Sequence, residues 1–266
     1  MKERIRKVAR RCLFATLLIL GLTACAHTKK ENVIKGVSQD SIASSETAFQ
    51  LPGALGENLF DEHYLVIADS IAAGDPDRYS HLTDKDFEKV AAQLDIEVAT
   101  IKAVVEIEAG KAMRGFWEPG VPVINFDATM FAKYKGKVAD KSGAKGESVP
   151  EGLTGYALKE YRQLINARKS NAQGAIMGTF WGMFQIGGFN YKICGCEDVN
   201  EFVKRMAYSE FEQLELFAIF IENTGYVDYL RKKDWAGFAK RYNGPSYAKR
   251  GYHTKMANAY KRYSQQ

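Results

Sequence analysis

One carboxylate of this 266-residue chain lies where a helix should bury its side chains. Residues 96–109 have helical periodicity, and at about 100° per residue Glu108 falls on the apolar stripe that includes Ile101. Glu106 should face away from that stripe. Burial of a carboxylate raises its pKa, which suits it to general acid catalysis near neutral pH. The alternative is that the last helical turn frays and Glu108 reaches solvent.

A second segment combines aromatic residues, glycines and an amide in a way that suits sugar binding. It runs from Trp181 to Asn190 and includes Phe184 and Gln185. Trp and Phe rings can stack on pyranose rings, and Gln supplies both a hydrogen-bond donor and an acceptor. We therefore predict that Trp181, Phe184 and Gln185 bind substrate, although a glycine-containing turn in the core would show the same pattern.

A third cluster, residues 241–247, follows an amphipathic helix and contains an Asn-Gly-Pro turn. Such a turn ends the helix and presents the residues at its tip. Tyr242 and Asn243 are therefore candidate site residues, and helix termination alone is the alternative explanation.

The elements that must position these segments begin with two consecutive helices. Thr83 and Asp86 have the spacing of a capping box, which predicts a helix that ends at Leu94. We expect Asp95 to cap the start of the next helix, the one that carries Glu106 and Glu108, and Gly110 to stop it.

The rest of the chain is also predominantly helical in pattern. Residues 117–127 interrupt the helical periodicity, with a short strand expected over 121–126, and residues 135–155 are predicted to form a surface loop. Further helices are expected at about 157–168, 198–208, 210–223, 234–242 and 253–263. The pattern predicts one mainly helical domain.

Three motifs, taken together and in order, resemble the N-acetylmuramidase domain of phage endolysins and bacterial cell-wall proteins. That domain is similar to the wider lysozyme and lytic transglycosylase superfamily, and the resemblance covers about residues 82–260. The motifs are Ile101-Lys102-Ala103-Val104-Val105-Glu106-Ile107-Glu108, Trp181-Gly182-Met183-Phe184-Gln185-Ile186 and Tyr242-Asn243-Gly244-Pro245.

The resemblance implies a mainly α, lysozyme-like helical domain with a small β or irregular element. It also implies hydrolysis of the β-1,4 bond between N-acetylmuramic acid and N-acetylglucosamine in peptidoglycan. Glu108, the second Glu of the Glu-x-Glu pair, matches the family's acid, which protonates the leaving oxygen. The 184–186 turn would line the sugar cleft, with Tyr242 and Asn243 near the acid.

The chain departs from the family's pattern at two positions. Asp127 falls where related domains usually have the Glu of a Phe-Glu pair, and it is our candidate for a second carboxylate or a wall residue of the site. Ala109 replaces the Ser that usually follows the acid. Neither change removes the acid, so we expect activity.

Two other functions are consistent with the same motifs. A lone Glu108 assisted by a group of the substrate would make a lytic transglycosylase, which leaves anhydro ends and does not need Asp127. A catalytically silent lipoprotein would bind peptidoglycan without turnover. An unpaired buried carboxylate costs several kcal/mol, which argues against the silent protein.

The N-terminus has the pattern of an export signal with a lipid anchor. A basic segment over 1–11 precedes an apolar run over 13–20 that is too short to span a membrane. Leu22-Thr23-Ala24-Cys25 resembles the lipobox of bacterial lipoproteins, which implies cleavage before Cys25 and lipidation of that cysteine. An ordinary signal peptide with an incidental Cys25 is the alternative.

This pattern predicts three parts of the chain. They are a signal peptide (1–24), lipidated Cys25 with a flexible polar tether (25–57), and the N-acetylmuramidase domain (58–266). In an envelope with two membranes, Ala26 after the cysteine favours the outer membrane, with the domain facing the periplasm. The expected partners are peptidoglycan glycan strands and, through the anchor, the membrane.

Composition and charge exclude several other classes of protein. With 46% hydrophobic residues the chain can bury a core and is not a disordered tail. The 37 Lys and Arg exceed the 32 Asp and Glu, but the expected signal peptide holds six of the former and one of the latter, which leaves 31 of each. Binding to nucleic acid therefore has no electrostatic support.

Cysteine and histidine patterns predict no metal site and no cofactor. Cys194 and Cys196 are too close for an unstrained disulfide, so we expect two structural thiols or one strained bridge rather than a redox pair. The four histidines are scattered and have no ligand spacing.

Overall fold

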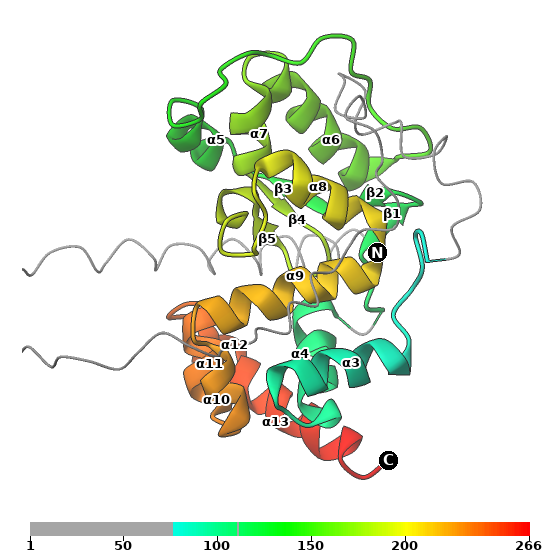
Figure 1. Cartoon of the computed structure of the whole chain (residues 1–266), viewed down its shortest axis with the longest axis vertical. Helices are drawn as coiled ribbons and strands as arrows, with labels where there is room; N and C mark the ends of the chain where they lie inside the picture. The colour runs from blue at the N-terminus through cyan, green and yellow to red at the C-terminus, as the bar shows by residue number, and fades with distance from the viewer. Residues whose placement is uncertain (1–76, 111) are drawn as a thin grey trace, which may run out of the picture.

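The computed structural model describes residues 77–110 and 112–266, which fold mostly into helices (Figure 1). The expected signal peptide, the tether and the expected domain start at residue 58 lie outside the described residues. The helices are α3 (Asp84–Leu94), α4 (Val98–Ala109), α5 (Ala128–Tyr134), α6 (Gly155–Arg168), α7 (Ala172–Met177), α8 (Val199–Tyr208), α9 (Glu210–Asn223), α10 (Val227–Arg231), α11 (Trp235–Tyr242), α12 (Tyr247–Arg250) and α13 (Tyr252–Tyr263). The strands are β1 (Phe116–Glu118), β2 (Val121–Pro122), β3 (Ile124–Phe126), β4 (Thr179–Trp181) and β5 (Ile186–Gly187), and a short 3₁₀ helix, η1, spans Gly188–Asn190.

Helix α9 lies between two groups of elements (Figure 1). One group contains α5–α8 and the strands, and the other contains α3, α4 and α10–α13. Helix α9 packs against α8 of the first group and against α3 and α10 of the second. This arrangement is the mainly helical domain with a small β element that the sequence predicts.

The junction of α3 and α4 differs from the prediction in one residue. Thr83 and Asp86 form the expected capping interaction, with the Thr83 N–H donating to the Asp86 carboxylate at 2.7 Å. Asp95, however, does not cap α4. It has a left-handed backbone (φ 52°) that closes the end of α3, whereas an N-cap needs extended backbone, and Glu97 provides it. Gly110 ends α4 as predicted, with φ 80°.

The strands form two small antiparallel sheets. Strands β1 and β2 make a hairpin, and β3, β4 and β5 form a three-stranded sheet in that order. The single strand expected over 121–126 is therefore wrong, because Val123 separates β2 from β3. The Val123 N–H donates to Gly115 O and its carbonyl accepts from Gly182 N, which joins the end of the hairpin to the β4–β5 turn.

The longer predicted helices are all present, within one or two residues at each end. They correspond to α6, α8, α9, α11 and α13, and residues 135–154 form the expected loop. The short helices α5, α7, α10 and α12 have no counterpart in the prediction, because four to seven residues do not establish a helical period.

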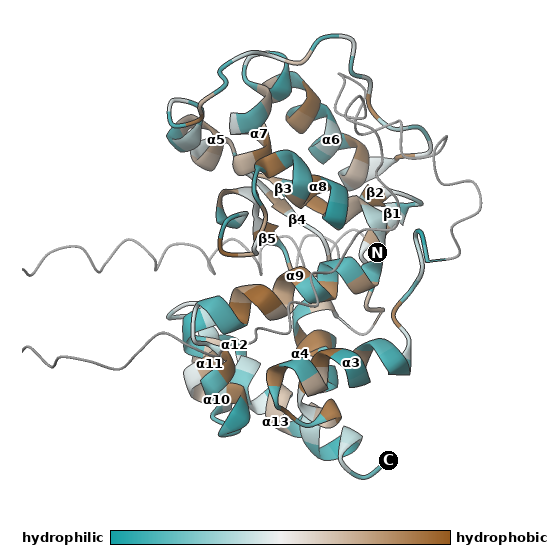
Figure 2. Ribbon diagram, in the orientation of Figure 1, coloured by the Kyte–Doolittle hydropathy of each residue, from teal (hydrophilic) through white to brown (hydrophobic). Residues whose placement is uncertain are grey.

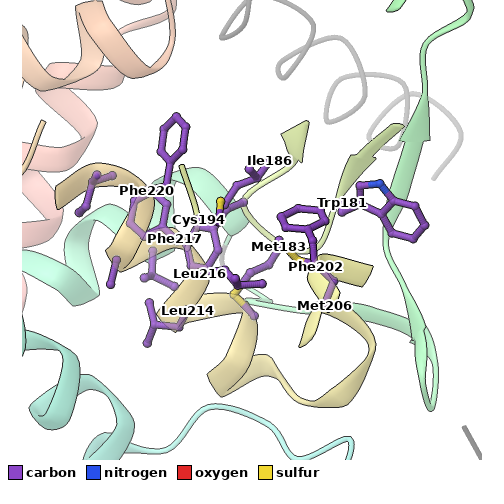
Figure 3. Packing of buried hydrophobic residues seen from close by; sticks show 14 of the residues in the cluster. Trp181, Met183, Ile186, Cys194, Phe202, Met206, Leu214, Leu216, Phe217 and Phe220 are labelled. Carbon is purple, nitrogen blue, oxygen red and sulfur yellow. The ribbon is translucent and has the colours of Figure 1, made fainter. Parts of the chain in front are cut away.

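The core lies where α8, α9 and the β4–β5 segment meet. Phe202 and Met206 of α8, Phe217 of α9, and Met183 and Ile186 of the β4–β5 segment pack together (Figure 3). Helix α4 and the middle of α9 are hydrophobic, whereas the visible face of α3 is hydrophilic (Figure 2). The described helices include none that is long and apolar enough to cross a membrane.

The two cysteines belong to this core as free thiols. Cys194 and Cys196 are both buried and form no disulfide. Burial raises the pKa of Cys196 to about 12 and also raises that of Cys194, so neither is a ready thiolate. The prediction of two structural thiols holds, and the strained bridge does not form.

Candidate active site

Glu108 lies in the last turn of α4, and that turn does not fray. The helix continues to Ala109, and Ile101, Val104 and Val105 on the same helix are fully buried. The Glu108 side chain is half-buried beside this apolar stripe. The sequence prediction that Glu108 is withdrawn from bulk solvent agrees with its position.

Glu106 faces a different neighbour from Glu108. Its carboxylate pairs with Arg262 Nη2 at 2.7 Å and accepts a hydrogen bond from the Tyr263 hydroxyl at 2.9 Å. Both partners lie at the end of α13. Glu106 therefore holds α4 against α13, away from the apolar stripe as expected.

The Asn-Gly-Pro turn brings Asn243 directly to Glu108. Asn243 is buried at the end of α11, and its Nδ2 donates to Glu108 Oε1 at 2.8 Å. The neighbouring Tyr242 donates from its hydroxyl to Phe184 O at 3.0 Å. Residues that are far apart in the sequence, from α4, the β4–β5 turn and α11, thus meet at one place.

Burial governs the protonation of Glu108. Loss of solvation raises its pKa from 4.5 to about 7, against a smaller lowering by the hydrogen bond from Asn243. A substantial fraction of the carboxyl groups is therefore protonated at neutral pH. This is the state that a general acid requires.

The expected stacking of sugar on Trp181 and Phe184 is wrong. Trp181 is 0% exposed, and its Nε1 donates to Ile176 O at 3.1 Å. Phe184 is 4% exposed and stacks on Phe217 with ring centroids 4.3 Å apart. Neither ring offers a free face, so both residues support the site from within the core.

Gln185 remains partly exposed at the tip of the β4–β5 turn. It adopts a left-handed backbone (φ 52°), and its Nε2 donates to Gly182 O at 2.8 Å. The amide nitrogen of the side chain is thus hydrogen-bonded to the backbone of its own turn. Gln185 is the one residue of the three predicted in this segment whose side chain reaches the surface.

Asp127 has a clear structural role. It is the N-cap of α5, and its Oδ1 accepts from the backbone N–H groups of Thr129 and Met130 at 2.8 and 2.9 Å. Its backbone N–H donates to Gly178 O. The capping interaction fixes the carboxylate at the β3–α5 junction, and no interaction with Glu108 is present in the described structure.

The part of the chain that the structure describes contains no group of three His, Cys, Asp or Glu residues that could hold a metal ion.

Comparison with known proteins identifies the family. The N-acetylmuramidase family model matches residues 97–264, which include α4 with Glu108 and the turn with Asn243. The chain belongs to the N-acetylmuramidase family. A solved structure described as a Burkholderia AP3 phage endolysin is similar, with 37% sequence identity, a TM-score of 0.60 and coverage of 72% of each chain. No curated protein matches the chain.

Membership of the N-acetylmuramidase family makes the chain a peptidoglycan hydrolase, a glycoside hydrolase of the lysozyme type. The matched segment includes every described helix except α3, and it therefore contains elements from both of the groups on either side of α9.

Two polar residues of the N-acetylmuramidase domain that the sequence did not indicate are central to its architecture. Glu210 and Gln213 lie one turn apart on α9 and are buried. Glu210 accepts from Gly115 N at 2.8 Å, and Gln213 donates to Gly115 O at 3.2 Å and accepts from Met183 N at 2.8 Å. They tie the segment after α4 to the β4–β5 turn. On a helix with polar residues at many positions, no sequence signal marks these two as buried.

Proposed function

We propose that this chain hydrolyses the β-1,4 bond between N-acetylmuramic acid and N-acetylglucosamine, with Glu108 as the general acid. The observation that supports the proposal is the half-buried carboxyl group of Glu108, with a pKa of about 7 and a hydrogen bond from Asn243. A carboxyl group with this pKa can donate a proton at neutral pH and accept it back.

Asn243 also determines which oxygen of Glu108 carries the proton. The amide Nδ2 donates to Oε1, so the proton is favoured on Oε2. Within the described residues no second hydrogen bond to Glu108 forms. Oε2 would therefore face the glycosidic oxygen, and protonation of that oxygen would allow the sugar to leave.

Product analysis tests this proposal. Purified sacculi are incubated with the mature protein or with its Glu108→Gln variant, and the soluble products are identified by mass spectrometry. We expect muropeptides with reducing N-acetylmuramic acid ends from the wild type and none from the variant. Binding to sacculi without products from either protein would instead support the silent peptidoglycan-binding lipoprotein.

A second candidate is a lytic transglycosylase, which the capping role of Asp127 favours. A carboxylate committed to two backbone N–H groups is poorly placed to act as a nucleophile or base, which would leave Glu108 to act with a group of the substrate. Products with 1,6-anhydro ends in the same experiment would assign this reaction.

Asp127→Asn separates the capping role from a catalytic one. Asn also caps helices well, so we expect a melting temperature within about 2 °C of the wild type and a kcat reduced by no more than about threefold. Turnover of solubilised glycan and thermal unfolding are measured on the same preparation. A loss of 100-fold or more with unchanged stability would make Asp127 a second catalytic carboxylate.

The raised pKa of Glu108 predicts an alkaline limb in the pH dependence. The acid must be protonated, so kcat/KM should fall above about pH 7 and approach a tenfold loss per pH unit. Initial rates on solubilised glycan between pH 5 and 9 measure this limb. Constant activity to pH 9 would show that another group supplies the proton.

We also propose that the mature chain is anchored to the membrane through Cys25, facing the periplasm from the outer membrane. The support is the Leu22-Thr23-Ala24-Cys25 motif after a basic and an apolar segment. Metabolic labelling with a radioactive fatty acid should mark the wild type. Cys25→Ser should remove the label and release the protein from the membrane fraction, and labelling that persists in this variant would exclude the site.

A further inference from the structure

The net positive charge of residues 77–266 is concentrated at the C-terminal end. Residues 235–266 contain seven Lys and Arg and no Asp or Glu. In contrast, residues 77–234 contain 21 Lys and Arg against 23 Asp and Glu. The positive charge therefore gathers on α11, α12 and α13, although the rest of the domain is nearly balanced.

Part of this charge lies on either side of the residues that reach Glu108. Lys240 and Arg241 occupy the last turn of α11, immediately before Tyr242 and Asn243, and Lys249 lies on α12 just after the turn. Helices α11 and α12 pack against each other at one end of their group (Figure 1). We call Lys240, Arg241 and Lys249 the cationic surface.

The cationic surface is not neutralised within the described residues. Lys240, Arg241 and Lys249 are exposed, and none of them pairs there with a carboxylate. Arg241 lies 4.0 Å from the Tyr229 ring centroid, which holds its guanidinium in place without removing its charge. Other cations of the same helical group are paired, such as Arg262 with Glu106.

We propose that the cationic surface binds the carboxylates of the peptide stems of peptidoglycan. This proposal rests on the proposed function. One of the two sugars at the scissile bond is N-acetylmuramic acid, whose lactyl group carries a peptide with free carboxylates. When Glu108 reaches the glycosidic oxygen, that peptide must leave the sugar near the acid and therefore near Asn243.

Charge complementarity distinguishes this partner from the glycan itself. The sugars of the strand are uncharged, so they gain nothing from a surplus of cations, whereas carboxylates do. Because the cations are exposed, each contributes modestly and the contribution is screened by salt. The surface would thus increase affinity for peptide-bearing strands and leave the chemical step unchanged.

A binding experiment with inactive protein tests the proposal. The mature chain with Glu108→Gln is compared with the same chain carrying Lys240→Gln and Lys249→Gln in addition. A matched control carries Lys85→Gln and Lys169→Gln, which remove two exposed cations on α3 and at the end of α6. Dissociation constants are measured for soluble glycan strands with intact peptides and for uncharged peptide-free strands. The latter are prepared by removing the peptides with an amidase and converting the lactyl carboxylates that this frees to methylamides.

We expect the Lys240→Gln, Lys249→Gln chain to bind peptide-bearing strands about threefold to tenfold more weakly at low salt, with the loss confined to those strands. The loss should shrink at 0.5 M salt, and the control should bind like its parent. Equal losses on both kinds of strand, a loss matched by the control, or no loss would each overturn the proposal.

Two further measurements distinguish peptide-stem binding from lipid binding and from failure of the proposed function. Binding to vesicles of phosphatidylglycerol and phosphatidylethanolamine tests a lipid partner, and a loss seen only there would replace the peptide stems with a membrane surface. Turnover of peptide-free strands by the wild type tests the proposed function independently. Its absence would reject the proposed cleavage of the β-1,4 bond with Glu108 as acid, without altering the binding comparison.

Discussion

Replacing Glu108 with Gln is expected to lower kcat roughly 10²–10⁴-fold, the usual contribution of a positioned general acid. Gln retains the carbonyl oxygen that accepts the hydrogen bond from Asn243 Nδ2, so the turn after α11 keeps its contact with α4. It cannot donate an acidic proton to a leaving oxygen. The effect should therefore fall on kcat, with little change in binding of the glycan.

The same substitution, which lowers kcat, should raise the stability of the fold at alkaline pH. Burial raises the pKa of Glu108 from 4.5 to about 7, so the folded protein holds a proton that the unfolded chain releases between these values. The stability of the wild type falls as pH rises through this window, by an upper limit of about 3 kcal/mol. Gln carries no charge, so Glu108→Gln should melt at a higher temperature than the wild type at pH 8. The difference should disappear below about pH 4.5.

Glu106→Gln is the matched control, because it makes the same chemical change two residues away on the same helix. It weakens the contact with Arg262 and Tyr263, so we expect a small loss of stability and a kcat within a few-fold of the wild type. Steady-state rates and thermal unfolding at pH 5 and pH 8 measure both variants. Near-normal turnover by Glu108→Gln, or a lower melting temperature at pH 8, would contradict the assigned role.

The contrast between Glu106 and Glu108 shows that helical periodicity in the sequence can predict which face of a helix a side chain occupies. The helical wheel separates the two carboxylates because rotation along α4 is regular and the apolar stripe is well marked. The long helices follow from the same regularity. The motif around Tyr242 and Asn243 was a candidate for the same reason, since a turn that ends an amphipathic helix presents its tip toward a neighbouring element.

The burial of side chains outside the long helices could not be predicted from periodicity. Trp181 and Phe184 have the residue types of a sugar-binding surface, but they pack inward. Trp181 belongs to β4, the middle strand of its sheet, and Phe184 stacks on Phe217 in the core. Asp95 and Asp127 illustrate a second limit. Asp is common both at helix starts and in left-handed positions, so its type alone assigned Asp95 to the wrong helix end and left the capping role of Asp127 unrecognised.

The hydrogen bonds between segments that are distant in the sequence were the feature that the sequence predicted least. Gly115, Met183 and Gln213 are brought together only by the packing of α9 between the two groups. An added Cβ at Gly115 would lie 2.4 Å from Gln213 Oε1, so the glycine is required by this close approach. Such a requirement arises from the folded arrangement and leaves no periodic pattern in the chain.

Gln213→Leu is expected to destabilise the domain by about 3 kcal/mol or more. Gln213 is 0% exposed and uses both ends of its amide: Oε1 accepts from Met183 N at 2.8 Å, and Nε2 donates to Met206 O at 2.8 Å and to Gly115 O at 3.2 Å. Leu has a similar volume and bonds to none of them. The buried Met183 N–H and Met206 carbonyl would lose their partner, at a cost of roughly 1–3 kcal/mol for each group left unsatisfied, whereas Gly115 O keeps the hydrogen bond from Val123 N.

Gln163→Leu on α6 is the control for this variant, because it makes the same change at an exposed position, where an effect within about 0.5 kcal/mol is usual. Urea unfolding of both variants gives the two free energies. The Gln213 variant should also turn over glycan more slowly under conditions where it is folded, because the segment after Glu108 and the turn of Gln185 lose their common support. If its stability and kcat both match those of the control, then the α9 amide does not hold the two sides of the site together.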